Sequence, residues 1–136
     1  MAGESRKNPA REVVARGPHG TVEFGIRSNG SMEAKEFLES PECKRTKPAL
    51  LALFQALVHR GPDDDEISPI PLRKTSIREF KKSNVRIFCF KHNSAWVLTN
   101  GFLKKSNQTP KKHIERAEDI MREDLARFGD NRSSGR

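Results

Sequence analysis

Apolar and polar positions along the chain form a series of short strand and helix patterns. In the stretch TVEFGI, the apolar side chains of Val22, Phe24 and Ile26 alternate with polar ones, which predicts a half-buried strand. The next stretch predicts a short helix that runs from an N-cap at Ser31 to about Glu39. The chain therefore opens with a strand followed by a helix.

A longer helical pattern spans TKPALLALFQALVHR, residues 46–60. Pro48 belongs in its first turn, and Gly61 followed by Pro62 ends it. The acidic stretch 63–71 that follows is predicted to be irregular. The broad apolar face of the helix, which predicts packing against a sheet, is formed by Leu50, Leu51, Phe54, Leu57 and Val58.

The period changes to two after residue 71. Residues 72–82 predict a polar strand with weak alternation. Residues 83–91 are nearly all apolar in their centre apart from Arg86, which is typical of a central strand covered on both faces. A turn at residues 92–95 leads into a strand over residues 96–103, and the short connection makes the two strands antiparallel.

A final helix follows, with Thr109 as its cap and Pro110 in its first turn. Its apolar stripe, which predicts packing on the core, is formed by Ile114, Ala117, Met121, Leu125 and Phe128. The element order β-α-α-β-β-β-α indicates an α+β domain with a small, mostly antiparallel sheet. We expect this domain over residues 20–128, after a disordered basic tail at 1–19 and before a flexible tail at 129–136.

The net charge of +8 is concentrated in one part of the chain. Residues 71–116 hold twelve basic and two acidic residues, a surplus of +10, whereas residues 31–70 carry −3. This asymmetry favours nucleic acid or another polyphosphate as partner over a protein kept soluble by scattered lysines. The longest apolar run is far shorter than the roughly 18 residues that span a bilayer, and the start lacks a secretory signal. We therefore expect a cytoplasmic protein with no membrane partner.

The two cysteines do not predict a disulfide framework or a metal site. Cys43 and Cys89 are 46 positions apart with no CxxC spacing, and Cys89 lies in an apolar run. No cofactor-binding loop is found either. We expect reduced thiols, no metal and no cofactor.

The C-terminal half resembles a known family. IREFKKSNVRIFCF and WVLTNGFLKKSNQTPKKHIERA resemble the RelE/HigB superfamily of bacterial toxins, most of all its HigB-like and phage-derived branch. The resemblance covers about residues 20–128 and is strongest over 72–120. The strand arginine of the family matches Arg86, and its Glu-x-basic strand matches Glu79 to Lys81. The block that carries most of the resemblance consists of Gly101, Phe102, Lys104, Lys105, Thr109, Pro110, Glu115 and Ala117.

This resemblance implies a function and a fold. Such toxins cleave messenger RNA, typically in the ribosomal A site, and a helix-turn-helix antitoxin neutralises them. The expected partners are thus a cognate antitoxin, mRNA and the 70S ribosome. The implied RelE-like fold packs its helices on one side of a four- or five-stranded sheet and leaves the other face for RNA.

RNA cleavage without a metal needs a base for the 2′-hydroxyl, an acid for the leaving oxygen and fixed cations for the charge that develops. Arg86 is the best candidate cation, because it is the sole charge within an apolar strand. The alternative is a structural ion pair with Glu79 on the neighbouring strand, and both roles are compatible. The aromatic residues Phe88, Phe90 and Trp96 are expected in the core rather than as stacking platforms for bases.

The lysines supply further candidates. Lys104 and Lys105 occupy successive strand-end positions, so we expect only one of them to face the site, and the same choice applies to Lys81 and Lys82. Arg78 belongs to the same basic strand. Lys111 and Lys112 stand at a helix N-terminus, which favours either a bound phosphate or simply a solvated helix start.

The acid and the base are left open by the sequence, because the chain contains no tyrosine, which many relatives place near this site. His113 and His92 are the titratable substitutes, and exposure to solvent is the alternative for each. Lys82 or Lys105 can act as base only if neighbouring cations lower its pKa. Two other functions remain open: a non-cleaving RNA-binding or antitoxin-binding module of the same fold, and a gyrase-poisoning toxin of the ParE-like type.

Overall fold

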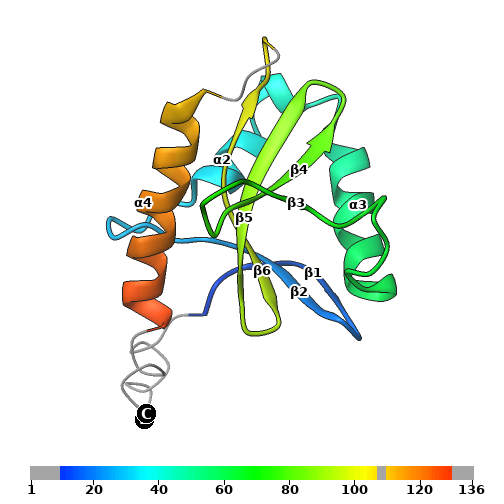
Figure 1. Cartoon of the computed structure of the whole chain (residues 1–136), viewed down its shortest axis with the longest axis horizontal. Helices are drawn as coiled ribbons and strands as arrows, with labels where there is room; N and C mark the ends of the chain where they lie inside the picture. The colour runs from blue at the N-terminus through cyan, green and yellow to red at the C-terminus, as the bar shows by residue number, and fades with distance from the viewer. Residues whose placement is uncertain (1–9, 107–109, 130–136) are drawn as a thin grey trace.

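The computed structural model describes residues 10–106 and 110–129 of the chain, which form a mixed sheet with helices on both faces (Figure 1). In chain order the elements are β1 (Val13–Gly17), β2 (Gly20–Phe24), α2 (Glu33–Leu38), the 3-10 turn η1 (Pro41–Cys43), α3 (Lys47–Arg60), β3 (Ile70–Pro71), β4 (Arg78–Lys82), β5 (Val85–His92), β6 (Ala95–Leu103) and α4 (Lys111–Phe128). None of the described helices is both long enough and apolar enough to cross a bilayer.

The six strands form one sheet in the order β1-β2-β6-β5-β4-β3. All neighbours are antiparallel except β2 and β6, which run parallel. The predicted α+β class with a mostly antiparallel sheet is therefore confirmed. The β5–β6 ladder shifts its register between Ile87 and Cys89, so one residue of β6 is bulged out beside this point.

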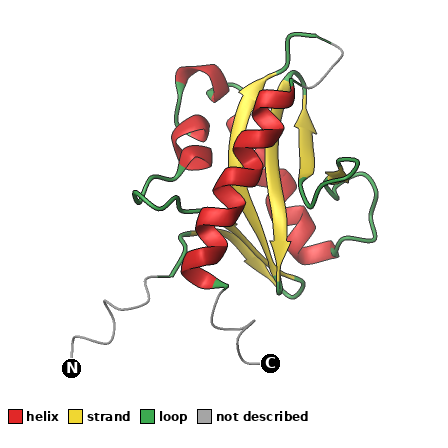
Figure 2. Cartoon of the chain, turned by 60° about the vertical axis from the view of Figure 1, so that its left-hand side comes forward, coloured by secondary structure: helices red, strands yellow, loops and turns green. Residues whose placement is uncertain are grey.

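The helices lie on both faces of the sheet, and the expectation that they pack on one side is wrong (Figures 1 and 2). One core cluster joins α2 and α3 to the inner residues Val85, Ile87 and Cys89 of β5. A second cluster joins α4 to Phe88 and Phe90, which point to the opposite face. We call these the α3 face and the α4 face. The apolar run of β5 is nearly continuous because both faces of this strand are covered by helices.

The chain joins the sheet earlier than expected. Val13–Gly17 form the edge strand β1, which pairs with β2, so the prediction of a disordered tail is wrong for this part. Arg11, just before β1, donates hydrogen bonds to the fully buried carboxylate of Asp124 on α4, with Nη2 2.7 Å from Oδ1. A buried charge needs such a partner, and the backbone N–H of Ile26 donates to the other oxygen at 3.0 Å. Residues 1–9 lie outside the described part.

Several predicted boundaries move. The polar strand begins at Arg78 rather than at residue 72, and Ile70–Pro71 form a two-residue strand in the stretch predicted to be irregular. The N-cap of α2 is Met32, without a side-chain hydrogen bond, rather than Ser31. Pro110 is the N-cap of α4 instead of a first-turn residue, and the predicted cap Thr109 is outside the described residues. The helix over 47–60, with Pro48 in its first turn and Gly61 as its C-cap, is confirmed.

Candidate functional site

The candidate site lies on the α4 face, at the end of the sheet where β6 leads into α4. Lys81, Arg86 and Phe102 are direct partners in neighbouring strands, because Lys81 pairs with Arg86 and Arg86 pairs with Phe102. Directly opposed residues share a face of the sheet. They therefore form a row across β4, β5 and β6, in which Lys81 is exposed and Phe102 is buried.

The guanidinium of Arg86 is held from two sides. Its Nη1 donates to the backbone oxygens of Ser83 at 2.8 Å and Val85 at 3.0 Å, at the turn between β4 and β5. Its Nε lies 3.6 Å from Oε2 of Glu79, and both of these buried atoms lack a hydrogen-bond partner in the described part of the chain. The ion pair offered by the sequence as the alternative role is thus present. These contacts use Nη1 and Nε, and Nη2 of Arg86 has no protein acceptor among the described residues.

A cavity of about 400 Å³ opens beside Arg86. Lys104 and Lys105 both line it, with Ser83, Asn84 and Ser106. The expectation that only one of the two lysines meets the site is wrong, because β6 ends at Leu103 and the strand alternation ends with it. The backbone N–H of Lys104 donates to Asn84 at 2.7 Å, which holds the start of the basic loop against the β4–β5 turn.

His113 stands next to this cavity, on the first turn of α4. Its imidazole stacks on the ring of Phe102, with centroids 3.9 Å apart and planes within 9°. Burial, with the nearby charges of Lys112 and Arg116, holds the pKa of His113 below its usual value near 6.5. The imidazole is therefore mostly neutral at pH 7 and is suited to accept a proton.

Two further cavities flank His113. One of about 250 Å³ reaches Glu33 and Arg116, whose side chains form an ion pair at 2.6 Å. The other, of about 340 Å³, is shared with Lys105 and Ser106, which also line the cavity beside Arg86. Lys112 lines both cavities beside His113. The three cavities are thus neighbours, and the basic residues around them converge from β5, the loop after β6 and α4.

The structure does not bring all the predicted residues together. Lys111 is exposed and faces Glu115 at 3.8 Å, as in a solvated helix start. Lys82 and Arg78 alternate with Lys81 along β4, so they lie on the α3 face, away from Arg86. His92 ends β5 six residues from Arg86, where its Nδ1 lies 3.0 Å from Nη2 of Arg11. Arg86, Lys81, Lys104, Lys105, Lys112 and His113 do gather around the site.

The expected core aromatics are confirmed as core residues: Phe88, Phe90 and Trp96 are at most 3% exposed. Cys43 and Cys89 are free and buried, and burial raises the pKa of the Cys89 thiol. Across residues 10–106 and 110–129, no three His, Cys, Asp or Glu side chains converge in the way a metal ion requires.

The sequence marks Phe102 and Gly101 only as part of the family block, yet both shape the site. A Cβ at Gly101 would lie 2.4 Å from the ring of Phe37 and 2.8 Å from Cδ1 of Ile87, so only glycine fits between α2 and β5. Gly101 also borders both cavities beside His113. A glycine within a strand pattern, directly before an aromatic residue, is the signal for this close approach.

Comparison with known proteins gives one family. The family model of phage-derived Gp49-like proteins (DUF891) matches residues 35–122, which is well over half of the chain and includes most of α2, all of α3, the strands β3 to β6 and most of α4. No curated protein matches the sequence significantly.

Proposed function

This chain belongs to the family of phage-derived Gp49-like proteins, a toxin-like family associated with toxins of the RelE/HigB type, and we propose that it is an mRNA-cleaving toxin. Its substrate is messenger RNA, bound on the ribosome, and its inhibitor is a cognate helix-turn-helix antitoxin. One observation carries the proposal: a mostly neutral imidazole, His113, adjoins a cavity lined by Arg86, Lys104 and Lys105.

The proposed reaction is an attack of the 2′-oxygen of a nucleotide on its own 3′-phosphorus. His113 takes the proton of the 2′-hydroxyl as the new O–P bond forms. Arg86 and Lys104 stabilise the extra negative charge on the phosphoryl oxygens, and the Nη2 of Arg86 has no protein acceptor among the described residues. The bond to the 5′-oxygen breaks, and Lys105 supplies the proton that this leaving oxygen needs. The products are a 2′,3′-cyclic phosphate and a 5′-hydroxyl.

The choice of Lys105 as the proton donor follows from its position and its charge. Lys105 lines both the cavity of Arg86 and that of His113, so it lies between the two ends of the proposed displacement. Lys81 extends the cationic row across the sheet and is suited to bind a neighbouring phosphate. Each of these groups is exposed or borders a cavity, as contact with RNA requires.

The test is induced expression in a bacterium, with mapping of new 5′ ends on abundant messages. Wild type is compared with Arg86→Ala and with the double variant Lys104→Ala/Lys105→Ala. The matched control is Lys44→Ala/Arg45→Ala, which removes the same charge from exposed positions outside the site. Growth arrest with new ends inside translated codons, retained in the control and lost in the site variants, is the expected result.

Two other outcomes lead to different functions. Arrest without new 5′ ends favours a gyrase-poisoning toxin and contradicts mRNA cleavage. A folded protein that binds RNA, causes no arrest and leaves messages intact is a non-cleaving binding module.

A further inference from the structure

A second group of cations surrounds Trp96 on the opposite side of the sheet. The ammonium of Lys91 lies 4.6 Å from the centroid of the indole ring, and the guanidinium carbon of Arg78 lies 5.5 Å from it. Trp96 is only 3% exposed, so its ring is a buried platform beneath the two cations. Cation–π attraction holds both head groups near one ring despite their mutual repulsion.

Arg78 and Lys91 also line one cavity of about 260 Å³ with Thr75 and Ser76. The hydroxyl of Thr75 donates to the backbone oxygen of Leu72 and accepts from the N–H of Ile77, which fixes the turn that leads into β4. The hydroxyl of Ser76 is on an exposed residue at the cavity. The cavity is therefore a preformed recess with two cationic groups and a hydroxyl at its walls.

No acidic side chain balances these charges among the described residues. The ion pairs within 10–106 and 110–129 include neither Arg78 nor Lys91. The arginines with acidic partners, such as Arg27 and Arg116, show that this chain usually pairs its cations. Two adjacent cations without a carboxylate, in a recess, indicate a site for an external anion.

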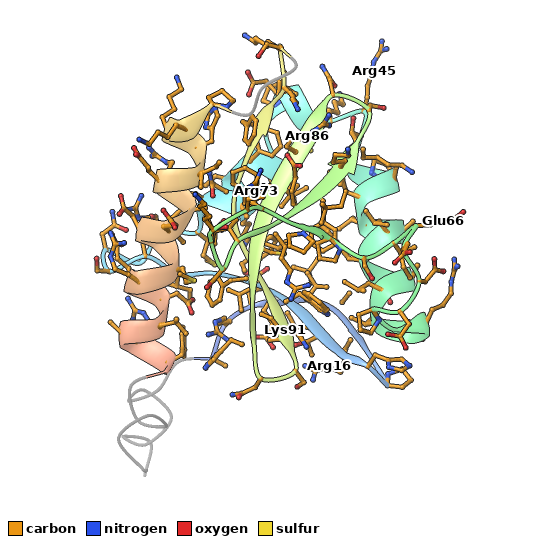
Figure 3. The ribbon with its side chains drawn as sticks, in the orientation of Figure 1. Arg16, Arg45, Glu66, Arg73, Arg86 and Lys91 are labelled. Carbon is orange, nitrogen blue, oxygen red and sulfur yellow. The ribbon has the colours of Figure 1, made fainter. Side chains whose placement is uncertain are left out.

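This recess is separate from the proposed cleavage site. Arg78 pairs with Cys89 on the α3 face, whereas Arg86 faces α4. Along β5, Lys91 is five residues from Arg86, which is about 17 Å at the usual rise of a strand. Figure 3 shows Arg86 and Lys91 toward opposite ends of the sheet. One phosphate cannot contact both sites.

We propose that Arg78 and Lys91 bind a phosphodiester group of an RNA backbone, at a second contact away from the scissile bond. This inference rests on the proposed function for the identity of the polyanion. A phosphate suits the recess because its oxygens can bridge a guanidinium and an ammonium, with Ser76 as a further donor. A base does not suit it, since the ring of Trp96 at this recess is buried under the two cations and is not accessible for stacking.

Trp96 is the only tryptophan of the chain, so its fluorescence reports directly on this recess. The probe is a short single-stranded 2′-O-methyl RNA, which lacks the attacking hydroxyl and therefore separates binding from cleavage. Titration into the wild type is expected to change the Trp96 emission with the same midpoint as binding measured by anisotropy of a labelled probe. Arg78→Gln/Lys91→Gln is expected to bind more weakly, with no change in emission.

The salt dependence counts the contacts. Loss of two phosphate contacts to single-stranded RNA makes the negative slope of log K against log salt shallower by about 1.4. The ratio of the wild-type binding constant to that of the variant therefore falls about sevenfold between 50 and 200 mM salt. The matched control is Arg60→Gln/Arg122→Gln, which removes the same charge from two exposed surface ion pairs with Asp64 and Asp119. Arg78→Lys/Lys91→Arg keeps both charges and is expected to keep the slope.

Three results separate the possibilities. Equal slopes for the Arg78/Lys91 variant and the control overturn the site and leave only an effect of net charge. A wild type that cleaves no message, while the Arg78/Lys91 variant alone loses slope and emission change, supports the site and removes the cleavage proposal. The same comparison with purified ribosomes tells ribosomal RNA from message as the source of the phosphate, because a defect confined to ribosomes identifies the former.

Discussion

The imidazole of His113 lies flat on the ring of Phe102, with the two centroids 3.9 Å apart. Phe102 is in turn the cross-strand partner of Arg86 and meets Phe88 edge to face at 5.2 Å. The stack therefore fixes the position of His113 on α4 relative to Arg86 on β5. In this way a helix and a strand that are far apart in sequence bring their functional groups to one candidate site.

The first prediction concerns pH. Because the pKa of His113 lies below about 6.5 and the neutral form accepts the proton, the rate of cleavage should rise with pH through that lowered pKa. Lys112→Gln removes one of the charges that lower the pKa, so the acidic limb of the profile should move to higher pH. The measurement is a single-turnover pH–rate profile, paired with NMR titration of the imidazole.

Lys111→Gln is the control for this experiment, because its side chain is exposed and faces Glu115 instead of the site. It should leave the limb in place. Protonation of His113 also destabilises the fold, because the imidazole of the unfolded chain binds its proton at higher pH than the folded one. The free energy of unfolding therefore falls as pH decreases from about 6.5 toward the folded pKa. An acidic limb that stays unchanged in Lys112→Gln removes His113 as the proton acceptor.

The second prediction separates the two roles of Arg86. Arg86→Ala leaves the buried Glu79 without its ion-pair partner and should lower the free energy of unfolding by about 1–3 kcal/mol. Adding Glu79→Gln removes the unpaired charge and should recover much of that loss, as measured by urea denaturation. Cleavage should remain absent in the double variant. Recovery of cleavage together with stability means that Arg86 serves only the fold.

The third prediction concerns Gly101. Gly101→Ala forces the ring of Phe37 and the end of Ile87 to move, which should cost about 1–3 kcal/mol of unfolding free energy. Phe37→Ala makes room on one side, so its combination with Gly101→Ala should cost less than the sum of the two single changes. A double-variant cycle by urea denaturation measures this. Strict additivity contradicts the close approach between α2 and β6.

The fourth prediction tests the anchoring of the N-terminal strand. Arg11→Ala leaves the fully buried Asp124 without its charge partner and should destabilise the protein by about 3–5 kcal/mol. Replacing both residues with leucine should recover a substantial part of this loss. Thermal or urea unfolding checks both variants. A small effect of Arg11→Ala means that residues before β1 contribute little to the fold.

Much of the architecture is predictable from the apolar period. The helix over 47–60 and the two long strands β5 and β6 have strong apolar patterns, because each buries a wide surface. The apolar pattern does not predict strand β1, because its few apolar residues, Val13 to Ala15, are surrounded by charged ones and one of its edges is open. An edge strand needs only half of the usual apolar pattern.

The choice of face was harder to predict. The stripe of α4 indicates that the helix packs on a sheet but not on which side, and the family resemblance suggested one side for all helices. The apolar run of β5 already required a cover on both faces, since Phe88 and Ile87 point in opposite directions. The site follows the same rule: the candidates Arg86 and Lys104 were visible in sequence, whereas the stack of His113 on Phe102 depends on where α4 lies.

The central claim is that Arg86, the lysines of the basic loop and His113 cleave messenger RNA through the 2′-hydroxyl. The most direct measurement adds the purified protein to ribosomes that translate an end-labelled message, and determines the chemistry of any new ends. We predict a 2′,3′-cyclic phosphate and a 5′-hydroxyl, lost in Arg86→Ala/Glu79→Gln and absent when the target nucleotide is 2′-O-methylated. An intact message with folded wild-type protein, or cleavage that persists at the methylated nucleotide, contradicts the account.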